Sequence, residues 1–220
     1  NLALTKLDMK KDAIKNNFES VIADMARNDK KSVVRALAIE KLGAYKKAAY
    51  TDLFKAAVND SSYTVAGNAL TALKEVDAPA AAQLVKKLAD TKMKGVLQEV
   101  VMNEILKSGD ESMADKIIGD FSKMPMSQGK FNALNGLQTY LGAIKNIEKV
   151  KWGVDEIVKF RDAIPEAFRD QTNPYINGMV LKTILEGKKK EAAANPGNSA
   201  LQELVNYIKA KFPEEERKGF

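Results

Sequence analysis

Apolar residues recur along the chain at the three- and four-residue spacing of helices that bury one face. Residues 1–9 lack this spacing and are expected to form an extended lead-in. The first amphipathic helix is predicted over residues 10–27. Its apolar positions are Ile14, Phe18, Val21, Ile22 and Met25. Asp29 follows, and its carboxylate is expected to accept from the free N–H groups of the next helix as an N-cap.

The same reading predicts helices along the rest of the chain. Asp77-Ala78-Pro79 predicts a boundary between two helices, because proline is well tolerated in the first turn of a helix. Asn173-Pro174 is expected to start a helix as an N-cap followed by proline. No segment alternates apolar and polar residues for long enough to predict a strand, so an all-α chain of about ten or eleven helices is expected. The predicted helices after Asp29 lie at about residues 30–43, 50–58, 60–73, 79–90, 93–107, 112–121, 127–140, 150–163, 174–187 and 198–211.

Four of these helices share one pattern of small and apolar residues. The pattern starts at Val34, Val65, Leu97 and Gly129, at steps of 31, 32 and 32 residues. Each start is followed by apolar or small residues at +4, +5 and +8, and one shorter helix lies between each pair. A regular step of this kind is typical of stacked helical hairpins, which bury their apolar stripes against one another. The full sets are Val34, Ala38, Ile39, Leu42; Val65, Ala69, Leu70, Leu73; Leu97, Val101, Met102, Ile105; and Gly129, Ala133, Leu134, Leu137.

The first copy resembles the second helix of HEAT repeats, which carries Val-Arg-x-x-Ala-x-x-x-Leu after an acidic turn. Here the match runs from Asp29 through Val34-Arg35 to Leu42, and Ala66 replaces the arginine in the next copy. The predicted fold class is therefore all-α, a HEAT-like α–α superhelix. We expect one helical-repeat domain over residues 1–220, with the clearest repeats at 29–142 and atypical helices at 147–212. Arg35 is expected to pair structurally with a turn acid such as Asp60, in preference to a functional role.

The chain contains neither histidine nor cysteine. Without histidine, histidine-based triads, imidazole general bases and histidine zinc sites are excluded within these residues. Without cysteine, disulfides and thiolate chemistry are excluded. A carboxylate site for Mg²⁺ or Ca²⁺ stays possible in principle. Acidic runs such as Asp155-Glu156 and Glu214-Glu215-Glu216 lack the spacing of metal ligands and are expected on solvated faces.

The net charge of +6 comes from 35 basic and 29 acidic residues that are interspersed along the chain. We interpret the lysine pairs and the Lys188-Lys189-Lys190 triplet as the surface of a soluble helical protein. Nucleic-acid binding is not expected, since no recognition motif or aromatic interleaving accompanies the charge. No apolar run approaches the ~18 residues of a membrane span. The sequence leaves the compartment open, periplasmic or cytoplasmic, and is interpreted as a piece of a longer protein.

One side of the repeated helices is predicted to be polar. At 100° per residue, the positions opposite the apolar stripes are Glu40, Thr71, Asn103 and Asn135. These residues are either ordinary solvated side chains or a polar wall that faces bound peptide or a partner domain.

Several segments resemble the C-terminal helical domain of bacterial zinc aminopeptidases of the aminopeptidase N (gluzincin) family. They are Leu42-Gly43-Ala44-Tyr45, the stretch from Asp60 to Gly67, Phe160-Arg161-Asp162-Ala163-Ile164-Pro165 and the tail Lys218-Gly219-Phe220. In that family a separate catalytic domain carries the zinc motif His-Glu-x-x-His. The resemblance implies a non-catalytic domain that caps the active-site cleft and limits peptide access. Its partners would be the catalytic domain of the same polypeptide and the peptide substrate.

Two functions are therefore expected to compete. The first is the accessory aminopeptidase domain, with no cofactor in this segment and zinc in the catalytic domain of the parent protein. The second is a stand-alone HEAT-type scaffold for protein–protein interaction. No catalytic or metal-binding residue is predicted in the segment itself, and whether the parent is an enzyme is decided outside these residues.

Overall fold

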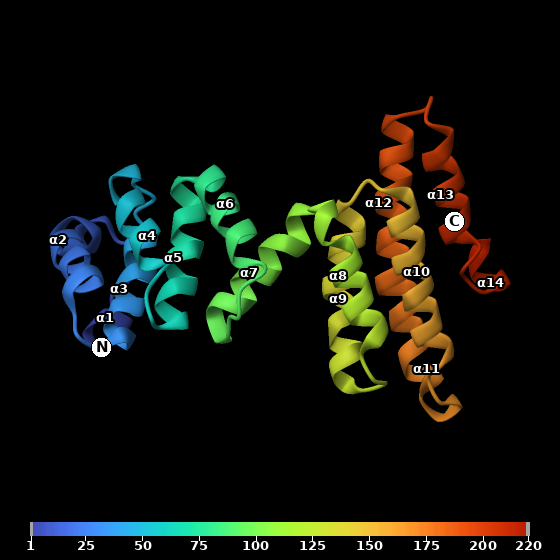
Figure 1. Cartoon of the computed structure of the whole chain (residues 1–220), viewed down its shortest axis with the longest axis horizontal. Helices are drawn as coiled ribbons and strands as arrows, with labels where there is room; N and C mark the ends of the chain where they lie inside the picture. Colours follow the sequence, from blue (N-terminus) through green and yellow to red (C-terminus); the bar gives the residue numbers. More distant parts are fainter. Residues whose placement is uncertain (1, 219–220) are drawn as a thin grey trace. The chain divides into compact units, whose positions relative to one another are not determined.

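The computed structural model describes residues 2–218, apart from the side chains of residues 2–3 and 12–16. Within this part of the chain every regular element is helical, which confirms the all-α prediction (Figure 1). The contacts divide the chain into two compact units, Asn1–Glu104 and Ile105–Phe220, so that the division falls inside helix α7. We describe each unit by itself; the predicted single domain over residues 1–220 stays a prediction.

The first unit is a stack of helices, in which α3 packs against both α2 and α5 and α5 packs against α4 and α6 (Figure 1). The apolar stripes predicted from the sequence form its core: Val34, Ala38, Ile39 and Leu42 are buried, as are Val65, Ala69, Leu70 and Leu73. Its elements are α1 (Leu2–Thr5), α2 (Asp12–Asn28), α3 (Ser32–Gly43), the 3-10 turn η1 (Ala48–Tyr50), α4 (Thr51–Ala57), α5 (Tyr63–Val76), α6 (Ala78–Leu88) and most of α7 (Gly95–Ser108).

Gly67 permits a close approach inside this stack. A Cβ atom built on it would lie 2.7 Å from Cγ1 of Val96 and 2.9 Å from the backbone nitrogen of Leu97. Backbone atoms cannot yield as a flexible side chain can, so the contact between α5 and the start of α7 requires glycine.

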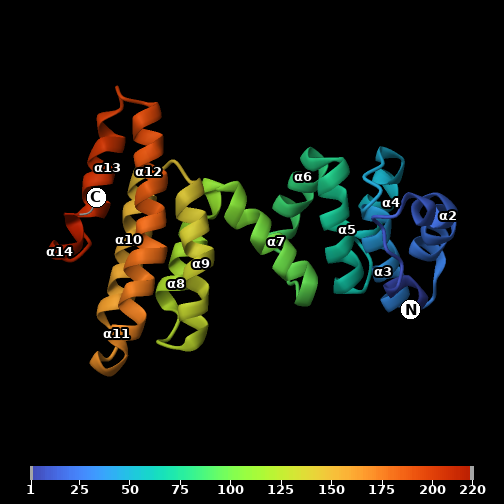
Figure 2. The ribbon, with the colours of Figure 1, turned by 180° about the vertical axis from the view of Figure 1, so that it is seen from behind.

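The second unit packs α9 against α12 and α10 against α8, α9 and α13 (Figure 2). Phe121 and Phe160 meet edge-on in its core, with ring centroids 6.2 Å apart. Trp152, the single tryptophan of the chain, packs half-buried against this core. The elements are η2 (Glu111–Met113), α8 (Ala114–Lys123), α9 (Gln128–Ala143), α10 (Ile147–Asp162), α11 (Glu166–Tyr175), the π-helix η3 (Ile176–Leu181), α12 (Lys182–Ala194), α13 (Ser199–Lys209) and α14 (Glu214–Arg217).

Three local predictions differ from the structure. The lead-in contains the short helix α1, whose Leu4 is buried. Lys31, not Asp29, occupies the N-cap position of α3; the Asp29 carboxylate accepts from the Lys31 N–H at 2.8 Å and so closes the preceding turn. Pro174 lies inside α11 and starts no helix. The helix continues past Pro174 into the π-helix η3, whose wider turn tolerates the backbone hydrogen bond that proline cannot donate.

The fourth repeat copy is also imperfect. Leu134 and Leu137 are buried as predicted, but Gly129 at the first position is exposed. Gly129 lies in the first turn of α9 and has no side chain to bury, so that the stripe of this helix begins one turn later.

Candidate protein-interaction surface

Arg35 and Asp60 join two neighbouring turns of the first unit. Nε and Nη2 of Arg35 donate to the two oxygens of Asp60 at 3.0 and 2.9 Å, while Nη1 donates to the Asp29 carbonyl at 2.9 Å. Asp60 also accepts from the Ser62 N–H at 2.8 Å, at the start of α5. The predicted structural pairing is confirmed. Such forked, charge-assisted contacts fix both distance and angle between the two turns.

Three of the four predicted surface residues lie on successive helices of the first unit. Glu40 lies on α3, Thr71 on α5 and Asn103 on α7, and all three side chains are exposed. The Thr71 hydroxyl donates back to the Gly67 carbonyl at 3.1 Å, which fixes its rotamer. The exposure agrees with the geometry that placed them opposite the buried stripes, while their role in binding stays a prediction.

Contacts between helices hold this side of the first unit in register. The side chain of Asn68 on α5 donates to the Ala36 carbonyl on α3 at 3.0 Å. Lys74 of α5 pairs with Glu104 of α7 at 2.6 Å. Exposed ion pairs contribute little stability. A side-chain hydrogen bond to a neighbouring helix, however, fixes the position of one helix along the other. The exposed residues are thus presented by a fixed backbone.

The fourth predicted residue, Asn135, lies on α9 in the second unit. Its side-chain oxygen accepts from the Tyr175 hydroxyl at 2.6 Å, and the Tyr175 ring lies 5.3 Å from that of Phe131. Sequence reasoning missed Tyr175, because its partner is 40 residues away and no local pattern marks the pair. Met179, in the π-helix that follows, is 61% exposed. Asn135 is therefore exposed in the second unit beside the half-buried ring of Tyr175.

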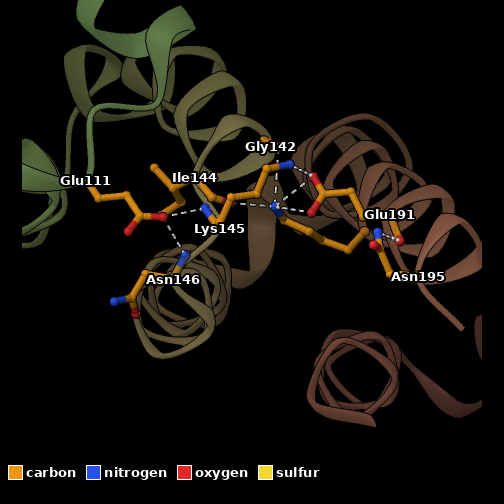
Figure 3. A network of polar contacts seen from close by, with 8 residues as sticks. Glu111, Gly142, Ile144, Lys145, Asn146, Glu191 and Asn195 are labelled. Carbon is orange, nitrogen blue, oxygen red and sulfur yellow. Dashed lines mark hydrogen bonds and ion pairs between the residues drawn. The ribbon is translucent and has the colours of Figure 1, made fainter. Parts of the chain in front are cut away.

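Lys188 departs most clearly from its prediction as a surface residue. It is only 1% exposed, and its Nζ donates to the Ile144 carbonyl at 2.6 Å and the Gly142 carbonyl at 3.3 Å, at the end of α9 (Figure 3). Glu191 lies one turn along the same helix, 3.2 Å from the ammonium. Burial lowers the pKa of Lys188 below its usual value, and the opposing effect of Glu191 is smaller. The lysine satisfies carbonyls that have no partner within their own helix.

The same network extends to the start of α10. One oxygen of Glu111 accepts from the N–H groups of Lys145 and Asn146 at 2.6 and 2.7 Å, and the Lys145 ammonium pairs with Glu191 at 3.0 Å (Figure 3). Together these contacts tie the α9–α10 connection to α12. They are a structural joint, because each charged group in it is committed to a neighbour.

Glu156 also departs from its prediction, since it is 7% exposed instead of solvated. Its carboxylate accepts from Lys159 at 2.7 Å. Burial, the largest influence, raises the pKa of Glu156, but hydrogen bonds from Lys159, Ser122 and Trp152 outweigh it and leave the pKa below its usual value. The carboxylate is therefore ionised and paired at neutral pH, which is the ordinary state of a buried structural acid.

Among the described side chains, those of residues 4–11 and 17–218, no group of three or more carboxylates is arranged to hold a metal ion. In the same range no helix has the length and apolar character that a membrane span requires.

The family comparison matches the first unit. Residues 19–103 match the model of a family described as HEAT repeats. This segment folds as HEAT-type repeats. It contains the repeat copies at Val34 and Val65 and, apart from Ile105, the copy at Leu97, which confirms the predicted fold class for this part of the chain. The copy at Gly129 lies outside the match. No curated protein and no solved structure matches the chain.

Proposed function

We propose that this HEAT-type helical chain is a protein-interaction module that binds its partner through the exposed side of α3, α5 and α7. The observation that carries the proposal is the recurrence of Glu40, Thr71 and Asn103 on that side, one per repeat, opposite a buried stripe. Stacked repeats present such equivalent positions as one extended surface, which suits a protein partner better than a small molecule.

The physical character of the surface supports a protein partner. Its three marker residues comprise one acid and two uncharged polar groups, and Val33 at the start of α3 is 61% exposed. A mixture of polar groups and isolated apolar side chains is the usual composition of a non-obligate protein interface.

Photo-crosslinking tests the proposal. Benzoylphenylalanine replaces Thr71 in one variant and Asn103 in another, and a third carries it at Lys87, an exposed residue of α6. One and the same protein is expected to crosslink from positions 71 and 103, and not from position 87. Crosslinking should vanish when Glu40→Arg is added, because a reversed charge inside an interface costs binding energy. Equal crosslinking from all three positions would refute this surface.

A second candidate is the C-terminal domain of a zinc aminopeptidase, and the observation that favours it is the resemblance of four segments. Three lie within the described residues; of the fourth, Lys218-Gly219-Phe220, the last two residues lie outside them. In this case the partner is a catalytic domain of the same polypeptide, which supplies zinc. The pure chain should then bind no zinc and release no amino acid from peptides. A full-length reading frame without an upstream His-Glu-x-x-His motif would eliminate this candidate.

A further inference from the structure

The first unit contains a hollow of about 370 Å³ between the end of α2 and the helix α4. Ala26, Leu53 and Ala57 give it an apolar wall, and Arg27 stands at its margin. The volume lies near the lower end of the range for ligand pockets, so it fits one residue and a neighbouring group, not a folded element.

The charges around the hollow do not cancel. Asp60 contributes a carboxylate, but both its oxygens are taken by the forked contact with Arg35. Arg27 is exposed, and among the described side chains, those of residues 4–11 and 17–218, its guanidinium has no ion pair or hydrogen bond. One uncompensated positive charge therefore stands beside an apolar wall.

We propose that this hollow binds an internal segment of a partner protein that presents an aliphatic side chain next to a glutamate. The aliphatic side chain enters against Ala26, Leu53 and Ala57, and the carboxylate pairs with Arg27 in the fork geometry that guanidinium groups offer. The inference rests on the proposed function in taking the ligand to be a protein. It concerns a site distinct from Glu40, Thr71 and Asn103, and adds the chemistry of the partner.

Arg27, and not the Arg35–Asp60 pair, gives the site its selectivity. Because the pair is neutral as a whole and its groups are committed, an incoming carboxylate meets Arg27 as the available cation. A neutral amide in place of the carboxylate loses the charge-assisted contact while keeping the apolar one. The site is therefore expected to bind a segment with glutamate more tightly than the same segment with glutamine.

A titration of the full chain with short blocked peptides, followed by amide NMR, tests the proposal. Acetyl-Leu-Glu-amide is expected to cause saturable shifts at Ala26, Arg27 and Ala57, with a millimolar dissociation constant. Acetyl-Ala-Glu-amide should bind at least about tenfold more weakly, corresponding to ~1.4 kcal/mol. Acetyl-Leu-Gln-amide should bind about threefold more weakly, which is the effect expected for losing one ion pair with an exposed guanidinium. Arg27→Gln should weaken the glutamate peptide by a similar factor, whereas Lys87→Gln, the same charge change on α6, should not.

Several results would overturn the proposal. They are an absence of saturable shifts at high millimolar peptide, equal affinity for the glutamate and glutamine peptides, and unchanged binding by a folded Arg27→Gln chain. Tighter binding of acetyl-leucine with a free carboxylate would overturn the assignment to an internal segment. If the peptides fail while crosslinks from positions 71 and 103 persist, only this site is refuted. If the crosslinks fail while the peptides bind as expected, the α3–α5–α7 surface is refuted and this site stands.

Discussion

Replacing Lys188 by methionine isolates the contribution of a buried ammonium. The change keeps most of the unbranched side chain and removes the group that donates to the Ile144 carbonyl at 2.6 Å and the Gly142 carbonyl at 3.3 Å. Glu191 is not stranded, because it is one-fifth exposed and keeps the Lys145 ammonium at 3.0 Å. The loss therefore falls on the carbonyls at the end of α9.

Two opposing effects set the magnitude. Leaving a buried carbonyl without a donor costs about 1–3 kcal/mol. Removing the buried charge stabilises the fold in part, because the charge no longer has to be desolvated. The same desolvation lowers the pKa of Lys188. Because two carbonyls lose their donor and the ammonium has a nearby counter-charge, we expect the unpaired carbonyls to dominate. The net loss should be about 1–3 kcal/mol, in the second unit.

Urea unfolding followed by fluorescence measures this loss where it occurs. Trp152 is the single tryptophan of the chain and lies in the second unit, so its emission reports that unit, while circular dichroism reports all helices. With a slope of about 2 kcal/mol/M, the fluorescence midpoint of Lys188→Met should fall by roughly 0.5–1.5 M. Lys189→Met is the matched control, because the Lys189 side chain is 39% exposed; its midpoint should hardly move.

An unchanged or raised midpoint for Lys188→Met would refute the reasoning. It would mean that desolvation of the ammonium costs at least as much as its hydrogen bonds to Gly142 and Ile144 return. The joint shown in Figure 3 would then set the position of α12 against α9 without stabilising it.

Three further predictions concern single contacts. Arg35→Met should destabilise the first unit by about 1–3 kcal/mol in thermal unfolding followed by circular dichroism. Lys46→Met breaks only the exposed pair with Glu75 and should destabilise it by less than about 0.5 kcal/mol. Equal losses of stability would refute the role of the forked contact between Arg35 and Asp60. Gly67→Ala should lower the free energy of unfolding by about 1–3 kcal/mol, because the added methyl group would clash with Val96 and Leu97. Gly187→Ala is the control and should be neutral or stabilising, because the space around Gly187 is open. A neutral Gly67→Ala would show that α7 can move away from α5. Burial raises the pKa of Tyr140 from 10.0 to about 12, so the neutral phenol stabilises the fold below pH 10 and that contribution is lost as the pH rises to about 12. In Tyr140→Phe, the free energy of unfolding measured by fluorescence should fall less steeply with pH over this range. An unchanged slope would contradict the prediction.

The sequence predicted those features that depend on near neighbours. The stripes at Val34 and Val65 are buried because helical periodicity alone decides which face can be apolar. The Arg35–Asp60 pair was also within reach, since each residue sits at a turn of a repeated unit. Pro174 was misread because the sequence cannot show that a π-helix follows and accommodates it.

Features that depend on distant partners could not be predicted. Lys188 is buried because the carbonyls of Gly142 and Ile144 lie against it, more than 40 residues away, and the neighbouring lysines give no sign of the difference. The contact of Asn135 with Tyr175 has the same character. The hollow beside Arg27 arises from the spacing of two helices and leaves no mark in the periodicity of either.

The positive charge of this chain has a structural use that bears on its function. Arg35 donates to the Asp29 carbonyl after α2, Lys130 to the Met124 carbonyl after α8, and Lys188 to the Ile144 carbonyl after α9. Arg169 and Arg217 do the same for Ile164 and Phe212, after α10 and α13. Helix C-termini carry unpaired carbonyls and partial negative charge, so a long cationic side chain is well suited to each.

This use changes how the net charge of +6 is interpreted. Five cations at helix ends donate to carbonyl oxygens of the chain itself, and these five are scattered over different helix ends and do not line one face. The basic excess therefore gives no argument for binding a polyanion, which requires cations along one exposed face. Arg27 differs from these five cations, because it lies in the last turn of α2 beside an apolar hollow and, among the described parts of the chain, its guanidinium has no ion pair or hydrogen bond. A cation placed in this way is suited to a contact with another protein.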